Sequence, residues 1–165
     1  MRTLAKVLGV IGLVVVLLVV AASAYGAWTV RRSFPQTAGT LTVSGLQSPV
    51  EVVRDARGIP QVYADSPHDL FFAQGYVQAQ DRFWEMDVRR HITAGRLSEM
   101  FGASQVDTDT FLRISGWYRV AQQELAMLSP ASRQHLDDYS AGVNAYLADH
   151  AGATASLEYV VLGLQ

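Results

Sequence analysis

The sequence predicts an α+β fold in which a β-hairpin is followed by amphipathic helices, all behind a long apolar N-terminal segment. β-Branched residues alternate with polar ones over residues 49–63, around a turn-forming stretch, as in a hairpin. Apolar residues recur at helical spacing over residues 67–94 and again beyond residue 107. The length of 165 residues fits one domain or a piece of a larger protein.

Charge and cysteine content exclude several classes of function. The formal net charge is −2, but residues 33–165 hold 9 basic and 15 acidic side chains, because four basic residues flank the apolar segment. A nucleic-acid-binding protein needs a basic face that releases counterions, and the sequence shows none. The chain has no cysteine, which excludes disulfides, cysteine metal sites and thiol catalysis.

Residues 1–32 are predicted to be a signal peptide or a transmembrane anchor. The run Val7–Val30 holds 24 residues without a charge, whereas a signal-peptide core has about 7–15 and a membrane span about 20. Length therefore favours an uncleaved anchor, while Ala22-Ser23-Ala24 is a site that a signal peptidase could cut. Two basic residues on each side leave the orientation open. Both alternatives export the rest of the chain, either anchored in the membrane through residues 7–30 or, after cleavage, secreted or periplasmic.

Residues 33–48 are rich in serine, threonine, glycine and proline, which predicts a linker. Within it, Thr40–Val43 has the composition of one short strand. The remaining residues, 49–165, are predicted to be one folded region.

That region opens with the predicted hairpin. Its strands are Pro49–Arg54 and Ile59–Tyr63, and the stretch Asp55–Gly58 between them has turn chemistry. Pro60 has no N–H, so we expect the second strand to pair on only one side near its start.

One long helix is predicted from Pro67 to about Ala94. Ser66 can cap it, Pro67 suits its first position, and the carboxylate of Asp69 can reach back toward the cap. Gly95 is expected to end it as a C-cap. Its 28 residues would span about 42 Å.

Shorter helices are predicted downstream. Residues 96–102 make one short turn, and the helical pattern then resumes near Asp107, breaks at Gly116 and continues to Leu128. Ser129-Pro130 repeats the cap-plus-proline start. The helix that follows ends before residue 152, and its apolar face comprises Leu136, Tyr139, Val143, Tyr146 and Leu147.

Apolar and aromatic residues lie on more than one side of the long helix, which indicates that more than one of its faces is buried. Residues 67–165 offer little to cover that helix twice. We therefore expect this chain to pack against something else.

No motif in the sequence marks a catalytic or metal site. The histidines show no metal-binding spacing and are expected on helix surfaces or at caps: His68, His91, His135 and His150. There is no G-x-S-x-G elbow and no phosphate-binding glycine loop. Asp107, Asp109 and Glu124 do not form the carboxylate pair of a glycosidase. Asp107-Thr-Asp109 resembles the start of a calcium loop but lacks the rest, so helix capping is favoured.

The charged stretch Asp81–Arg90 raises a choice between a catalytic helix and a scaffold. Glu85 and Arg89 are four apart in the favourable order, and Asp87 and Arg90 are three apart. These charges alternate with large aromatic residues. A half-buried helix whose arginines bond to carboxylates and carbonyls of neighbouring segments is the favoured interpretation.

Several stretches follow one another in an order that is typical of a known family: Arg54-Asp55, Gly58-Ile59-Pro60, Tyr63-Ala64, Asp69–Asp87, Arg89-Arg90, Gly95–Glu99, Phe101-Gly102, Leu128–Pro130, Tyr139–Tyr146 and Leu157–Gly163. On these residues the chain resembles the N-terminal region of the penicillin acylase family, over about residues 50–165. Gln61 and Gln78 stand where many relatives carry histidine, at positions that are not catalytic in the family.

The resemblance implies an N-terminal-nucleophile hydrolase with an αββα fold. Such enzymes are made as an exported precursor that cuts itself into a small α chain and a large β chain. The nucleophile is the serine that becomes the first residue of the β chain, and its own α-amino group acts as the base. Oxyanion donors also come from the β chain. The reaction cleaves an acyl amide, of the β-lactam side-chain or N-acyl-homoserine lactone type, into an acid and an amine.

The resemblance carries no catalytic, substrate-binding or metal residue onto this sequence. The family's nucleophile, its acyl pocket and the α-chain carboxylate that helps to bind calcium correspond to positions beyond residue 165, so calcium is expected only in the full-length enzyme. Tyr76, Phe83 and Trp84 are expected to pack against the β chain and further α-chain helices. Residues 49–165 would be an incomplete α-chain domain, inactive by itself. The alternative is a membrane-tethered, non-catalytic helical binding module or a truncated product.

Overall fold

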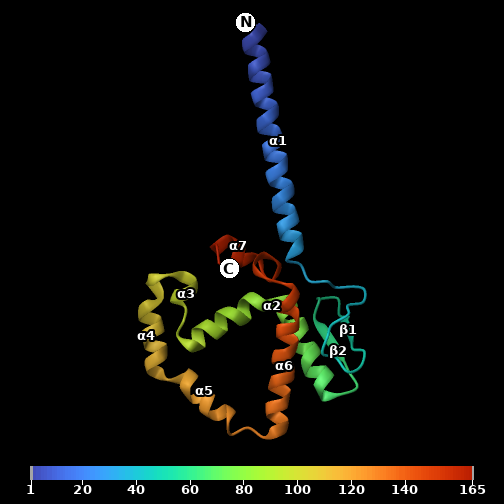
Figure 1. Cartoon of the computed structure of the whole chain (residues 1–165), viewed down its shortest axis with the longest axis vertical. Helices are drawn as coiled ribbons and strands as arrows, with labels where there is room; N and C mark the ends of the chain where they lie inside the picture. The colour runs from blue at the N-terminus through green and yellow to red at the C-terminus, as the bar shows by residue number, and fades with distance from the viewer. Residues whose placement is uncertain (1, 165) are drawn as a thin grey trace. The chain divides into compact units, whose positions relative to one another are not determined.

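The computed structural model describes residues 2–164 and divides the chain into two compact units, Met1–Phe34 and Pro35–Gln165. The first unit consists of α1 (Arg2–Arg32), a single helix (Figure 1). Its segment Lys6–Arg32 is long and apolar enough to cross a membrane, a property that it shares with signal sequences. A helix suits a membrane span because it satisfies every backbone hydrogen bond internally.

The second unit begins with an irregular segment, residues 35–48, which we call the strap. The predicted strand at Thr40–Val43 is wrong, because these residues form no strand. Gly39 and Gly45 turn the backbone on either side of them, with φ of 99° and 114°. The segment between the two turns has no backbone ladder to join, so its β-propensity has no effect.

The hairpin is confirmed. β1 (Glu51–Arg54) and β2 (Pro60–Tyr63) pair antiparallel, with Glu51 opposite Tyr63 and Arg54 opposite Pro60. The Asp55 carboxylate accepts hydrogen bonds from the backbone N–H groups of Arg57 and Ile59 and so builds the turn.

The long helix α2 (Pro67–Ala94) has the predicted bounds. The Ser66 hydroxyl accepts a hydrogen bond from the Asp69 N–H, and Gly95 ends the helix in the left-handed conformation, with φ of 63°. The sequence did not predict the kink at Arg82, where φ is −146°. No proline or glycine marks the kink, which lies between the half that packs on α6 and the half that packs on the segments around α4 and α7.

The remaining elements are short helices, except for α6. Gly116 breaks the predicted helix in two, as expected, and Ser129 caps α6. The last helix was not predicted, because its six residues are too few to show a helical period. The elements are α3 (Ser98–Phe101), the 3₁₀ turn Ala103–Gln105, α4 (Val106–Ser115), α5 (Trp117–Leu125), α6 (Pro130–Asp149), the 3₁₀ turn Gly152–Thr154 and α7 (Leu157–Leu162).

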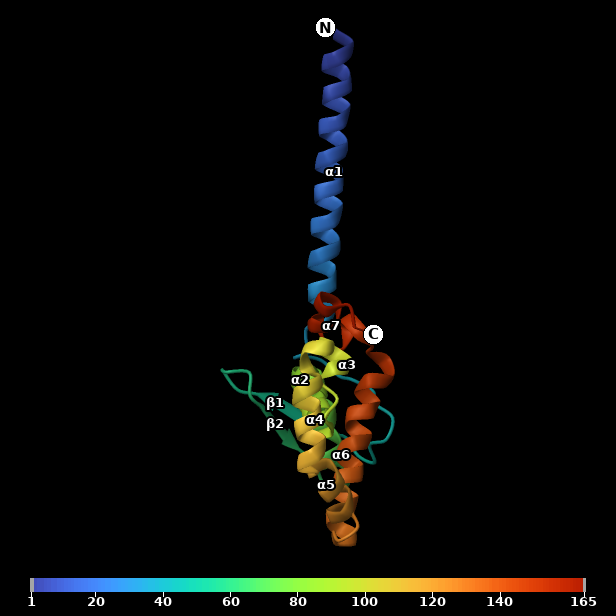
Figure 2. The same ribbon diagram turned by 90° about the vertical axis from the view of Figure 1, so that its left-hand side faces the viewer.

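The core lies where α2 crosses α6 (Figures 1 and 2). Two glycines allow the crossing. A Cβ on Gly75 would lie 2.1 Å from the carbonyl oxygen of Tyr139, and a Cβ on Gly142 would lie 1.8 Å from that of Phe72. The two backbones are therefore in direct contact, and residues buried beside them include Phe72, Ala73, Val77, Ala79 and Tyr146.

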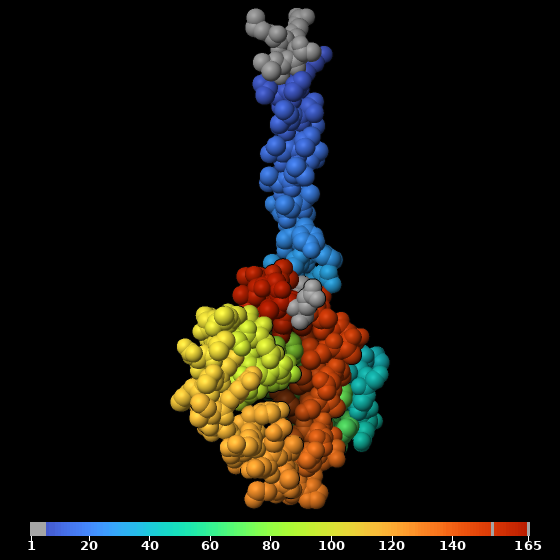
Figure 3. Space-filling view, turned by 60° about the vertical axis from the view of Figure 1, so that its left-hand side comes forward, coloured from blue at the N-terminus to red at the C-terminus, as the bar shows by residue number. Residues whose placement is uncertain are grey.

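By contrast, α4 and α5, which lie on the surface in Figure 3, carry several exposed apolar side chains. Among the described residues, α5 buries no side chain at all. The exposed apolar residues of α4, α5 and the turn after α5 include Phe111, Ile114, Trp117, Tyr118, Val120 and Met127. Large apolar residues exposed together on neighbouring helices are typical of a contact with another polypeptide.

Candidate functional site

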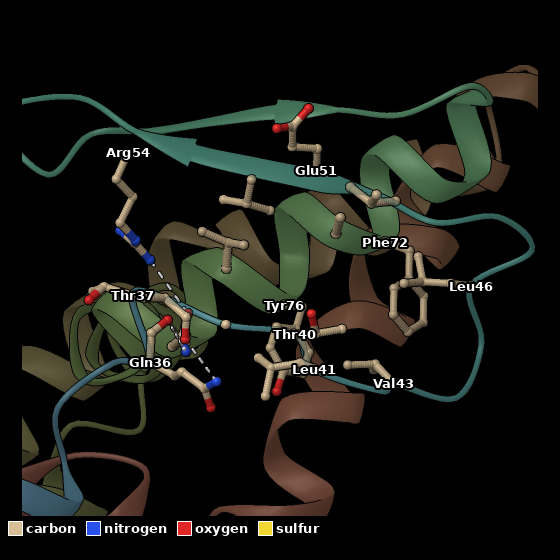
Figure 4. Close-up of a pocket in the computed structure, with 17 residues that line it drawn as sticks. Gln36, Thr37, Thr40, Leu41, Val43, Leu46, Glu51, Arg54, Phe72 and Tyr76 are labelled. Atoms are coloured by element: carbon tan, nitrogen blue, oxygen red, sulfur yellow. Dashed lines mark hydrogen bonds between the residues drawn. The ribbon is translucent and has the colours of Figure 1, made fainter.

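A cleft of about 460 Å³ lies between the strap, β1 and α2 (Figure 4). Its floor is formed by one face of α2, including Phe72 and Tyr76. Strap residues such as Leu41 and Val43 line one side, and β1 lines the other. The cleft is open to solvent and its lining is about as polar as it is apolar, a combination that suits an extended guest with both polar and apolar groups.

Polar side chains tie the rim of the cleft together. The Arg54 guanidinium donates to both carboxylate oxygens of Asp81, each at 2.8 Å, which fixes β1 to α2 by a two-pronged ion pair. The Gln80 side-chain amide donates to the carbonyl oxygen of Gln36 at 3.3 Å, which fixes the strap to the same helix.

Two neighbouring side chains at the start of α2 hold the far end of the strap. His68 Nε2 lies 3.0 Å from the Gly45 carbonyl oxygen, and His68 Nδ1 lies 2.7 Å from the buried carboxylate of Asp138 on α6. Both partners offer acceptor oxygens, so the doubly protonated imidazolium is the form of His68 that satisfies both contacts. The hydrogen bond to Gly45, followed by that to Asp138, raises the pKa of His68.

Asp69 forms the second of these contacts. Its buried carboxylate accepts from the Gln47 N–H at 2.7 Å and from the Ser66 hydroxyl at 3.0 Å. The hydrogen bond from Gln47 is the main reason why the pKa of Asp69 is lowered. The predicted carboxylate at the helix start is thus confirmed, and its main partner is the strap.

The charged stretch of α2 centres on Asp87, which is buried. Its carboxylate accepts from the hydroxyl of Tyr159 on α7 at 2.5 Å and from the Arg90 guanidinium at 2.6 Å. Burial alone would raise the pKa of Asp87, but these hydrogen bonds outweigh it and hold the pKa below its usual value. Burial, followed by the bond to Asp87, raises the pKa of Tyr159. These contacts join two segments of the chain and match the scaffold interpretation.

The arginines of this stretch differ from expectation in one respect. The chain segments outside α2 are reached by its carboxylates, Asp81 and Asp87, rather than by its arginines. Arg82 lies near Glu85 on the surface, at 3.4 Å, and is exposed. Spacing within a helix cannot show which member of an ion pair has a partner elsewhere.

The aromatic residues predicted to face a β chain make contacts within this chain. Tyr76 packs edge-to-face on Tyr146 of α6, and Phe83 stacks on Tyr159 of α7. Trp84 packs edge-to-face on Phe101 and on Tyr159. All three remain half-buried, so each retains surface for a further partner.

Asp109 caps a helix, the role that the sequence favoured, but the helix that it caps is α3 and not α4, in which it lies. Its carboxylate accepts from the backbone N–H groups of Leu97 and Ser98, at 2.7 and 2.8 Å, at the start of α3. Burial opposes the charge on Asp109, but the hydrogen bonds from Ser98 and Leu97 lower its pKa overall. No group of three metal-ligating side chains occurs in the described part of the chain.

The other histidines are structural as well. His91 Nδ1 and His150 Nδ1 each lie 2.8 Å from the carbonyl oxygen four residues earlier, while the His135 ring stacks on Phe71. Within residues 2–164, none of the hydroxyls lining the cleft, those of Thr37, Thr40 and Tyr76, is hydrogen-bonded to a histidine or a carboxylate. The arrangement can hold and position a guest. That the chain supplies no catalytic residue stays a prediction.

Sequence reasoning missed the cleft and the contacts made by His68 and Tyr159. Each depends on residues far apart in the chain: His68 and Asp138 are separated by 70 positions, and Asp87 and Tyr159 by 72. The serine, threonine, glycine and proline of the strap predicted a linker, but this composition does not show where the strap packs.

Comparison with known proteins identifies relatives. The family model described as penicillin amidase matches residues 49–165. Penicillin acylase 2 proenzyme of Pseudomonas sp. (strain SE83) is 36% identical over 82% of this chain, which corresponds to 17% of its own length. Acyl-homoserine lactone acylase QuiP of Pseudomonas fluorescens (strain Pf0-1) is 37% identical over 75% of this chain and 15% of its own length.

A solved structure agrees with these relatives. The thermostable penicillin G acylase from Alcaligenes faecalis is 33% identical, with a TM-score of 0.64 over 71% of this chain and 63% of the solved chain. The chain described here therefore spans about a sixth of the length of the curated relatives, but most of the solved chain.

Proposed function

The chain belongs to the penicillin amidase family, and we propose on that basis that it is the α-chain region of an exported N-terminal-nucleophile amidohydrolase. The observation that carries the proposal is the family match over residues 49–165, together with the shared fold. The substrate is an acyl amide, of the N-acyl-homoserine lactone or β-lactam side-chain type, and the products are an acid and an amine.

We propose that catalysis resides on a companion β chain that begins with serine. The serine hydroxyl attacks the amide carbonyl, the α-amino group of the same residue takes the proton, and β-chain donors stabilise the oxyanion. Two observations support a short chain with a larger companion. One relative is a proenzyme, and this chain covers far more of the solved chain than of that proenzyme. The exposed apolar surface of α4 and α5 offers a face for such a companion.

The role of this chain is then to support the β chain. The half-buried rings of α2, the Asp87–Tyr159 contact and the α2–α6 crossing make a rigid frame for the catalytic chain. Calcium, where the full-length enzyme binds it, takes ligands from outside the residues described here.

We propose that α1 anchors the protein on the outer side of the membrane, with a cleaved signal as the alternative. The aromatic rings of Tyr25 and Trp28 lie near the end of the apolar run, and the Arg32 guanidinium sits 4.2 Å above the Trp28 ring. Aromatic and basic residues gather in this way where a helix leaves a membrane.

The test begins with the native protein, recovered from its own cells with an antibody to residues 133–150. We expect a denaturing gel and mass spectrometry to show this chain with a larger companion whose first residue is serine. The purified complex should release amine from an N-acyl-homoserine lactone or from penicillin G. A lone chain without a companion and without amidase activity would refute the proposal and would favour a tethered, non-catalytic module.

A further inference from the structure

The outer edge of β1 has unpaired backbone groups. The Asp55 N–H donates to the Ile59 carbonyl at 3.1 Å, and residues opposite each other in an antiparallel pair alternate between bonded and non-bonded pairs. The backbone groups of Val53 therefore turn toward β2, and those of Val52 and Arg54 turn outward. Within the described residues, no backbone hydrogen bond from outside the hairpin reaches either of these two.

The two edges of the hairpin are not equivalent. The outer edge of β2 carries Pro60, which has no N–H and blocks the addition of another strand. The outer edge of β1 carries no proline and borders the cleft, which is lined by Val50, Glu51, Val52 and Arg54 but by no residue of β2 (Figure 4).

The hairpin is also incompletely covered. Val52 is 39% exposed on one face of the strands, and Val53 is 43% exposed on the other. A two-stranded hairpin is marginal in water unless further strands or a helix cover it. A third strand along β1 would satisfy the free backbone groups and shield both valines.

We propose that an extended segment of the companion polypeptide lies in the cleft and pairs with the outer edge of β1. This inference rests on the proposed function, since it takes its occupant from the proposed β chain. The apolar floor formed by Phe72 and Val77 suits a strand with apolar side chains at every second position.

The structure favours this occupant over a second copy of the chain. In a pairing between two β1 edges, each copy would bring its own strap into the cleft of the other, because the strap lines the same outer side. A single extended segment brings no such obstacle. The relatives also contain a large additional length of polypeptide, since this region is 17% of the proenzyme.

The test is hydrogen exchange at single-residue resolution in the full-length gene product. We expect the amides of Val52 and Arg54 to exchange at least about a hundredfold more slowly than in an unstructured peptide. The amide of Val53, which pairs with β2, is the internal control. Rapid exchange at Val52 and Arg54 beside a protected Val53 would overturn the inference.

Two variants of the full-length protein sharpen the test. Val52→Pro removes the outward N–H without touching a bond to β2, and Val52→Thr keeps it. We expect Val52→Pro to speed exchange at Arg54 by tenfold or more, with Val53 still protected, while Val52→Thr leaves both amides slow. Unchanged protection of Arg54 in Val52→Pro would contradict strand pairing.

The outcomes separate this inference from the proposed function. A serine-initiated companion with rapidly exchanging Val52 and Arg54 amides would leave the proposed function intact and refute the pairing. Slow exchange at both amides in a chain that has no companion would refute the occupant, because another partner would then fill the cleft.

Discussion

Replacing Gly142 with alanine would place a methyl group inside the backbone of α2. The new Cβ would lie 1.8 Å from the Phe72 carbonyl oxygen and 3.0 Å from the Tyr76 nitrogen, and real Cβ atoms essentially never come closer than 3.0 Å. Both obstacles are backbone atoms, which cannot rotate away. The helices would have to separate by roughly 1 Å, enough to lose a quarter to a half of the attraction between atom pairs across the crossing.

The expected magnitude follows from two opposing effects. Overpacking in a tight core costs about 1–3 kcal/mol, and this collision belongs at or above the upper end. Alanine recovers about 1 kcal/mol of intrinsic helix propensity. We therefore expect Gly142→Ala to lower the opening free energy of α6 by about 2 kcal/mol or more.

Native-state hydrogen exchange of the α6 amides measures this free energy locally. Ser140→Ala is the matched control, because Ser140 is exposed on the same helix and its replacement changes propensity without a collision. Protection in Gly142→Ala equal to that in Ser140→Ala would refute the close crossing.

Three further predictions concern single contacts. Tyr159→Phe leaves the buried Asp87 carboxylate without one donor and should lower the free energy of unfolding, measured by urea denaturation, by about 1–3 kcal/mol. The control Tyr118→Phe changes an exposed tyrosine and should have little effect. Equal losses in the two variants would contradict the role of the Tyr159–Asp87 hydrogen bond. The Gly45 carbonyl, followed by Asp138 and Asp69, raises the pKa of His68, so the contribution of His68 to stability is complete below about pH 6.5 and is lost as pH rises through the higher folded-state value. The protection factor of the Gln47 amide, which is the exchange rate relative to an unstructured peptide at the same pH, should therefore fall as pH rises through the folded-state pKa of His68. A pH profile of this protection factor that Asp138→Asn leaves unchanged would argue against the contact. The pKa of Asp109 is lowered, so the pH dependence is the opposite: the stabilisation by Asp109 is complete above about pH 4 and is lost as pH falls. Asp109→Ala should therefore abolish the protection of the Leu97 and Ser98 amides from hydrogen exchange at neutral pH. Retained protection would show that these amides have another acceptor.

Local signals predicted the bounds of most elements. Ser66 and Gly95 delimit α2, Gly116 separates α4 from α5, and Ser129 starts α6, because caps act within one turn of the residues that form them. The hairpin followed from its turn residues in the same way.

Features that depend on distant partners could not be predicted. Thr40–Val43 has strand composition but no neighbouring strand, and the kink at Arg82 has no proline or glycine to announce it. The sequence correctly favoured capping for Asp109, but only the fold shows that the capped helix is α3. The cleft arises from where the strap packs, which no local pattern determines.

Several contacts of α2 can form only late in the synthesis of the chain. Gln78, His68 and Asp87 meet partners that lie 61, 70 and 72 residues further along the chain. Synthesis from the N-terminus delivers α2 long before these partners, so its aromatic side stays uncovered while the intervening residues are made. Closing such long loops is slow, and exposed apolar surface invites aggregation in the meantime. We therefore expect the uncovered side of α2 to be a binding site for chaperones until residues 138–159 have emerged.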